Sequence, residues 1–106
     1  MIINGFNTKK KVLIVAEIGN NHEGKFLLAK KMIDLAHKAG ADAVKFQTFK
    51  VEKFISKNNE ARFQKLKKFQ LSFSEFNKLK SYAVKKKLIF ISTPLDLISS
   101  SFISRI

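Results

Sequence analysis

The sequence contains no cysteine and no tryptophan, and it has only one proline and four glycines among its 106 residues. The absence of cysteine excludes disulfide bonds and zinc sites built on thiolates, and it fits a cytoplasmic protein. No apolar run approaches the roughly 18 residues that a membrane-spanning helix needs. The basic residues Lys9–Lys11 precede an apolar stretch, Val12–Ala16, but that stretch is shorter than the roughly 7–15 residues of a secretory core. We therefore expect a cytoplasmic protein without a membrane segment.

Acidic residues are also scarce, since 8 Asp and Glu stand against 21 Lys and Arg and give a formal net charge of +13. A charge of this size is typical of proteins that bind nucleic acid. However, nearly all of these basic residues are lysines, and most fall on the expected solvent faces of helices, as Lys30, Lys67 and Lys85 do. The sequence has neither an arginine cluster nor the alternation of basic and aromatic residues that would indicate a nucleic-acid-binding module. We interpret the lysines as a solvated surface and keep a non-enzymatic, nucleic-acid-binding module as the alternative.

Hydrophobic residues make up 45% of the chain and include 11 Phe, which is enough material for the core of one small domain over residues 1–106. Residues 1–11 are short and polar, and their Asn4-Gly5 pair predicts a small hairpin. The β-branched run of residues 12–18 predicts a strand buried on both faces.

A helix and two further strands are expected after this first strand. Residues 26–39 have helical spacing and end at Gly40, which suits a left-handed C-terminal cap. Residues 41–46 and 88–92 predict the second and third strands. The apolar face of the helix is expected to comprise Leu28, Met32, Leu35, Ala36 and Ala39.

The region between the second and third strands is less regular. Residues 51–62 are polar and predict a long loop, and residues 63–69 predict a short helix. Ser72 and Glu75 have the spacing of a capping box, which predicts a helix that runs to about residue 87. After the third strand, Asp96 is placed to cap one more helix.

Alternation of strands and helices predicts parallel strands joined by right-handed crossovers. Three strands with their helices make either a small open α/β sheet or the first three β/α units of a (β/α)8 TIM-type barrel, which needs about 250 residues. We expect the second arrangement, with the barrel incomplete in this chain.

Each expected strand ends on polar side chains. These are Glu17 on the first strand, Lys45 and Gln47 on the second and Thr93 on the third. Because α/β barrels and open sheets place their sites at the carboxyl ends of strands, we expect the four to converge at one rim. Lys45 suits a carboxylate or phosphate, Gln47 and Thr93 can hold substrate oxygens, and Glu17 can accept a hydrogen bond from a sugar hydroxyl or transfer a proton. Two alternatives are a buried structural ion pair between Lys45 and Glu17, and a Schiff base on Lys45 as in barrel aldolases.

The loop after the first strand carries a histidine but no strong site motif. One histidine, His22, with one nearby Glu is a weak metal signal, and we interpret His22 as a loop residue that hydrogen-bonds locally. We expect no metal site among these residues. Gly19 and Gly24 match neither GxGxxG nor a P-loop, so nucleotide binding has no support.

Three motifs resemble the amino-terminal portion of the sialic acid synthase family, which includes N-acetylneuraminate, legionaminate and pseudaminate synthases. They are AEIGNNHEG at Ala16–Gly24, AGADAVKFQTFK at Ala39–Lys50 and FISTPLD at Phe90–Asp96. The resemblance implies a (β/α)8 barrel that condenses phosphoenolpyruvate with an N-acetylated amino sugar such as N-acetylmannosamine, in cell-surface carbohydrate biosynthesis. Water is consumed, phosphate leaves and a nonulosonic acid forms. The resemblance also implies a homodimer and a divalent metal, Mn²⁺ or Mg²⁺, that activates the sugar aldehyde.

The same resemblance implies roles for the four strand-end residues. Glu17 matches the glutamate that contacts the acceptor sugar and the reacting centre. Lys45 and Gln47 match a pair whose lysine contacts phosphoenolpyruvate, and Thr93 matches the threonine that binds its phosphate. Leu95 stands where the family usually has Phe.

Other parts of the family's site are expected outside this sequence. The metal-binding histidines lie on later strands, and a carboxy-terminal antifreeze-like domain caps the partner's barrel. We therefore expect the complete chain to be the enzyme and the 106 residues alone to be inactive. A related phosphoenolpyruvate-dependent synthase of another keto-deoxy sugar acid is an alternative, although the AEIG and NHEG motifs favour the sialic acid branch.

Overall fold

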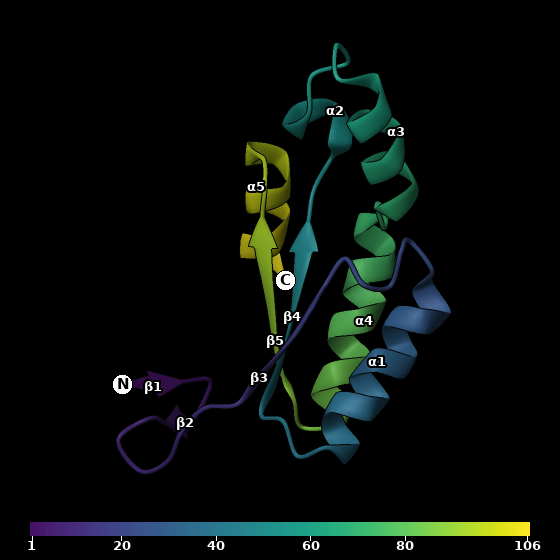
Figure 1. Ribbon diagram of the computed structural model, residues 1–106. Coiled ribbons are helices and arrows are strands. Elements are labelled where there is room, and N and C mark those ends of the chain that lie inside the picture. Colours follow the sequence, from purple (N-terminus) through teal and green to yellow (C-terminus); the bar gives the residue numbers. More distant parts are fainter.

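A three-stranded parallel sheet forms the centre of the protein in the computed structural model, which describes residues 1–106 (Figure 1). The strands lie in the order β3 (Val15–Gly19), β4 (Ala43–Thr48) and β5 (Ile89–Pro94). β4 pairs in parallel with both neighbours. The expected α/β architecture and the parallel direction of the strands are therefore confirmed.

Five helices accompany this sheet. α1 and α4 lie side by side along it, whereas α2 and α3 lie beyond the carboxyl ends of the strands (Figure 1). None of the helices has both the length and the apolar character needed to cross a membrane. The helices are α1 (Phe26–Lys38), α2 (Val51–Phe54), α3 (Glu60–Phe69), α4 (Phe73–Lys85) and α5 (Leu97–Arg105).

The first residues form the predicted hairpin. Strand β1 (Ile2–Ile3) pairs antiparallel with β2 (Phe6–Asn7). Asn4 and Gly5 between them have φ angles of 46° and 83°. Two consecutive positive φ angles are what an Asn-Gly hairpin turn requires.

The central strand β4 supplies the middle of the hydrophobic core. Val44 and Phe46 are fully buried and belong to one cluster with Ile33 of α1 and Phe76 of α4. The Phe46 ring lies 6.2 Å from that of Phe76 and 5.6 Å from that of Phe90, measured between centroids. Burial of one such side chain stabilises the fold by about 1.5–3 kcal/mol. The sheet and the two long helices are therefore held together through β4.

The first strand is shorter and more exposed than predicted. It begins at Val15, and Val12, which was expected inside it, is 76% exposed. β3 lies at the edge of the sheet and pairs with β4 alone. The residues just before Val15 do not pair with a strand on either side, so the side chains of Val12 and Ile14 stay exposed to solvent.

The buried face of α1 also differs from the prediction. Ala29, Ile33 and Ala36 are buried, whereas Leu35 is 55% exposed. The helix packs on the core through Ile33 and two alanines, Ala29 and Ala36. Gly40 follows the helix with a φ of 87°, as predicted for a left-handed cap.

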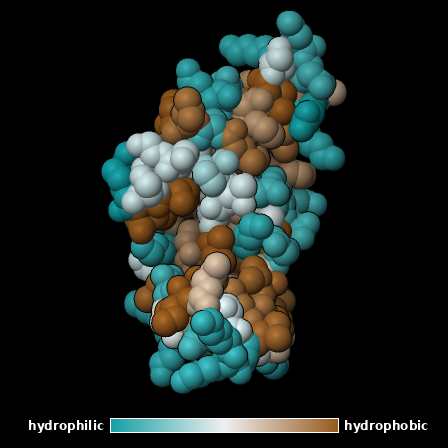
Figure 2. All heavy atoms as spheres, turned by 90° about the vertical axis from the view of Figure 1, so that its left-hand side faces the viewer, coloured by the Kyte–Doolittle hydropathy of each residue, from teal (hydrophilic) through white to brown (hydrophobic).

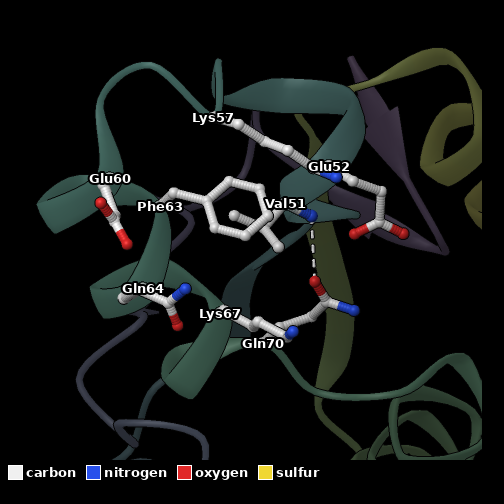
Figure 3. A pocket seen from close by; sticks show the side chains of 8 residues that line it. All are labelled: Val51, Glu52, Lys57, Glu60, Phe63, Gln64, Lys67 and Gln70. Atoms are coloured by element: carbon white, nitrogen blue, oxygen red, sulfur yellow. Dashed lines mark hydrogen bonds between the residues drawn. The ribbon is translucent and has the colours of Figure 1, made fainter.

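The prediction of a long loop over residues 51–62 is wrong. This segment contains α2, and α3 begins at Glu60 rather than at residue 63. Val51 and Phe63 are buried in a second small core, and the backbone N–H of Val51 donates to Gln70 Oε1 at 2.9 Å (Figure 3). Tertiary contacts therefore stabilise α2 and the first turn of α3, which the polar sequence does not predict.

The two predicted helix caps are confirmed. Ser72 Oγ accepts a hydrogen bond from the backbone of Glu75 at 3.0 Å, and Glu75 Oε1 accepts one from the backbone of Ser72 at 2.9 Å. This reciprocal pair is the capping box of α4. Asp96 caps α5 by a single bond of this kind, accepting from the backbone N–H of Ser99 at 2.7 Å.

Gly24 brings the loop after β3 into direct contact with α3. Its φ is 76°, and a Cβ at this position would lie 1.9 Å from the carbonyl oxygen of Lys68 and 3.3 Å from Cα of Phe69. These atoms belong to the backbone and cannot rotate away. The loop and the end of α3 therefore pack backbone against backbone, with no space for a side chain.

We predict that Gly24→Ala is much more destabilising than the same change at Gly40. Both glycines have positive φ, so each alanine costs about 1–2 kcal/mol from the backbone conformation. Gly40 has nothing within 4 Å of the added Cβ, whereas Gly24 has the Lys68 carbonyl there, which adds about 1–3 kcal/mol. Urea unfolding of both variants measures the difference. Equal losses of stability would contradict the close packing.

Candidate functional site

The four predicted site residues lie on one face of the sheet. The register places Glu17 beside Lys45, and Gln47 beside Thr93. Lys45 Nζ donates to Glu17 Oε1 at 3.3 Å. The opposite face, which carries Val44 and Phe46, packs against the helices. The structure thus brings together an acid, an amine, an amide and a hydroxyl near the carboxyl ends of three strands.

The ion pair between Lys45 and Glu17 is not buried. The Lys45 side chain is 36% exposed and that of Glu17 is 65% exposed. Exposed ion pairs stabilise a fold by only about 0–1 kcal/mol. The pair exists but is not buried, as the structural alternative required, and its charges remain accessible to a ligand.

Asn20 holds the side chain of Gln47. The register of β3 shifts between Glu17 and Gly19, and the φ of Gly19 is 56°. This irregularity turns the chain so that Asn20 Nδ2 donates to Gln47 Oε1 at 2.8 Å. Sequence reasoning did not assign a role to Asn20, because its partner is 27 residues away and the contact depends on the irregular end of β3.

Asp96 joins the end of β4 to the start of α5. Its Oδ2 accepts from the backbone N–H of Lys50 at 2.7 Å and from Ser99 Oγ at 2.8 Å. Burial by itself would raise the pKa of Asp96, but the hydrogen bonds from Lys50 and Ser99 outweigh it and hold that pKa below its ordinary value. The charged carboxylate therefore stabilises the folded state.

His22 is fully buried and makes the local hydrogen bond that was predicted. Its Nδ1 accepts from the backbone N–H of Gly24 at 3.0 Å, and its ring lies 6.0 Å from that of Phe46. Burial lowers the pKa of His22, and the nearby Glu75 offsets this in part. No group of three His, Cys, Asp or Glu side chains is placed to hold a metal ion.

A parallel sheet that gathers polar side chains at its carboxyl edge is the arrangement in which α/β proteins bind small molecules. Residues 32–106 match the model of the family described as the NeuB family. The chain therefore belongs to the NeuB family.

Several relatives carry names of synthases. The N,N'-diacetyllegionaminic acid synthase of Campylobacter jejuni is 38% identical over 110 residues, which are 92% of this chain and 33% of that protein. The N-acetylneuraminate-9-phosphate synthase of Mus musculus is 32% identical over 107 residues, covering 90% of this chain and 30% of that protein. The chain thus spans about a third of the length of these curated relatives.

Solved structures agree with this assignment. N-acetylneuraminic acid synthetase from Leptospira borgpetersenii, in complex with citrate, superposes with a TM-score of 0.84 at 35% identity, covering 89% of this chain and 33% of that chain. Spore coat polysaccharide biosynthesis protein SpsE from Bacillus subtilis superposes with a TM-score of 0.68 at 36% identity, covering 89% and 26%. The α/β fold with its parallel sheet is shared with sialic acid synthase structures.

We predict that Lys45→Met changes the free energy of unfolding by less than about 1 kcal/mol, because its ion pair is exposed. Lys11→Met is a matched control, since Lys11, whose side chain is 67% exposed, forms another ion pair, with Asp42 at 3.7 Å. Denaturant unfolding at neutral pH measures both. A loss of several kcal/mol in Lys45→Met alone would show that Lys45 has a structural role.

We also predict that Asp96 makes the protein sensitive to acid. Because its pKa is lowered in the folded state, its contribution is present above the unfolded pKa of about 3.9 and is lost as the pH falls through the lower, folded pKa. Asp96→Asn should have a lower free energy of unfolding than the parent at about pH 7. This difference between parent and variant should become smaller towards about pH 3. Urea unfolding across this range tests it, with exposed Glu52→Gln as the control. A gap that is constant with pH would contradict the prediction.

Proposed function

We propose that this chain is the amino-terminal part of a synthase that condenses phosphoenolpyruvate with an N-acetylated amino sugar to give a nonulosonic acid. The observation that carries the proposal is the placement of Glu17, Lys45, Gln47 and Thr93 on one accessible face of the sheet. The names of the Campylobacter and mouse relatives support a reaction of this class.

The three strands and their helices are, in this proposal, the first three β/α units of a (β/α)8 barrel. The face that carries Lys45 and Gln47 would then point to the inside of the barrel. Apolar side chains that the sheet and helices leave exposed, among them Val12, Ile14 and Leu97, would be covered by later units. Figure 2 shows patches of hydrophobic surface on one side of the molecule, which fits such covering.

In this proposal, some strand-end residues bind phosphoenolpyruvate and others bind the acceptor sugar. Lys45 supplies a positive charge to the carboxylate or phosphate of phosphoenolpyruvate, and the Thr93 hydroxyl donates to a phosphate oxygen. Glu17 accepts from a hydroxyl of the acceptor sugar near the reacting carbon, and Gln47 holds a substrate oxygen. Condensation consumes water and releases phosphate. Because Lys45 Nζ and Glu17 Oε1 lie 3.3 Å apart, the two substrates that they contact would meet at this pair.

A divalent metal such as Mn²⁺ or Mg²⁺ supplies Lewis-acid activation of the sugar aldehyde in this reaction class. The residues of this chain do not fit such a metal, since no suitable cluster of ligands is present and the one buried histidine, His22, is committed to its own loop. Association of two copies and a role in cell-surface carbohydrate synthesis belong to the same proposal for the complete protein.

A chimera tests the proposal. This chain would replace the matching amino-terminal region of the Campylobacter jejuni synthase, to which it is 38% identical. We expect release of phosphate from phosphoenolpyruvate that depends on the acceptor sugar. Lys45→Gln and Thr93→Val should each lower kcat/KM by about 100-fold or more, because each removes a contact to a charged substrate.

Lys10→Gln, a change of the same kind in a residue distant from the strand ends, is the control and should leave the chimera active. A chimera that folds, as judged by circular dichroism, but releases no phosphate would refute the proposal. Full activity of the Lys45 variant would refute the role given to Lys45.

A further inference from the structure

A cavity of about 400 Å³ opens at the carboxyl end of β4, between the strand ends and α3. Half of its lining is apolar and comes from Phe49, Phe54, Leu66 and Leu95. The cavity touches Gln47 but neither Lys45 nor Thr93. It is therefore a neighbour of the strand-end cluster rather than the same set of residues.

Two cations on α3 line this cavity without a compensating acid. Arg62 and Lys65 lie three positions apart and so share one side of the helix. Neither takes part in any of the three salt bridges of the chain, and no Asp or Glu lines the cavity. The Arg62 guanidinium lies 5.8 Å from the ring centre of Phe54, a stacking contact that leaves its N–H groups free to donate.

The amide of Gln47 is oriented to act as a donor as well. Asn20 Nδ2 already donates to Gln47 Oε1 at 2.8 Å, so the free end of that amide is its Nε2–H₂ group. The remaining oxygen of Asn20, Oδ1, is buried and has no partner, so Asn20 presents no accessible acceptor to the cavity. The polar groups offered by Gln47, Arg62 and Lys65 are therefore all hydrogen-bond donors.

We propose that this cavity binds an oxyanion, a carboxylate or phosphate group of a small molecule, through Arg62, Lys65 and the Gln47 amide. Asn20 is the positioning residue that keeps Gln47 in its donor orientation. The binding itself does not depend on the proposed function. Within that function, the oxyanion is either a charged substituent of the acceptor sugar or part of phosphoenolpyruvate.

Titration of the 106-residue chain by ¹⁵N NMR tests the site directly. The probes are inorganic phosphate, phosphoenolpyruvate, N-acetylmannosamine and N-acetylmannosamine 6-phosphate. We expect the anionic probes to shift the Gln47 side-chain amide and the Arg62 Nε resonance, and the neutral sugar to leave them unchanged at equal concentration. A stronger response to the sugar phosphate than to phosphoenolpyruvate would assign the oxyanion to the acceptor, and the reverse order would assign it to phosphoenolpyruvate.

Matched variants separate the site from general charge. Arg62→Gln and Lys65→Gln should each weaken binding by about tenfold, whereas Lys68→Gln, on the same helix but outside the cavity, should not. Asn20→Asp should weaken binding and move the Gln47 amide signal in the free protein, because a carboxylate can only accept from that amide. Asn21→Asp adds the same charge one residue further on, at an exposed position, and should do neither.

Equal binding by the neutral sugar, or equal losses in the Lys68 and Lys65 variants, would overturn the proposal. So would an unshifted Gln47 amide in folded Asn20→Asp. The outcome is separable from that of the chimera. Anion binding at Gln47 and Arg62 together with an inactive chimera would support the oxyanion site and refute the synthase function. An active chimera without anion binding at these residues would support the synthase function and refute the oxyanion site.

Discussion

The structure depends on the burial of one face of β4. Val44, Phe46 and Thr48 share one face and are fully buried, the first two against the helices, so Lys45 and Gln47 must point to the other face. A slip of one residue in the pairing would exchange the two sets and place an ammonium group in the core. The large ring of Phe46, packed between Phe76 and Phe90, makes such a slip very costly. The direction in which Lys45 and Gln47 point follows from this constraint.

The strands, the parallel sheet and the shared face of Glu17, Lys45, Gln47 and Thr93 could be predicted from sequence. Apolar runs of the right length identify strands, and their period of two assigns faces without knowledge of the tertiary structure. The caps at Ser72 and Asp96 could be predicted for a similar reason, since each is a contact between residues three apart. The catalytic roles proposed for the four strand-end residues come from the resemblance to the synthase family.

What could not be predicted depends on contacts between distant residues. The apolar residues of α1 fit two overlapping faces, and only packing against the sheet selects the one with Ala29 and Ile33 over the one with Leu35. Segment 51–62 becomes partly helical because its residues Val51 and Ile55 pack against Phe49 and Phe63, which lie outside it, and because Val51 donates to Gln70. Figure 3 shows the hydrogen bond that joins Val51, at the start of this segment, to Gln70 after α3. The Asn20–Gln47 hydrogen bond likewise requires the irregular end of β3.

The spacing of the parallel strands along the chain has a consequence for how the protein folds. Glu17 and Lys45 are 28 residues apart, and the contact between Lys50 and Asp96 spans 46. Closing loops of this length costs chain entropy before any sheet contact compensates for it. High contact order of this kind slows folding, whereas helices such as α4 form from local contacts within microseconds. The helices are thus expected to form before the sheet, and the cluster of Glu17, Lys45, Gln47 and Thr93 would be among the last features to assemble.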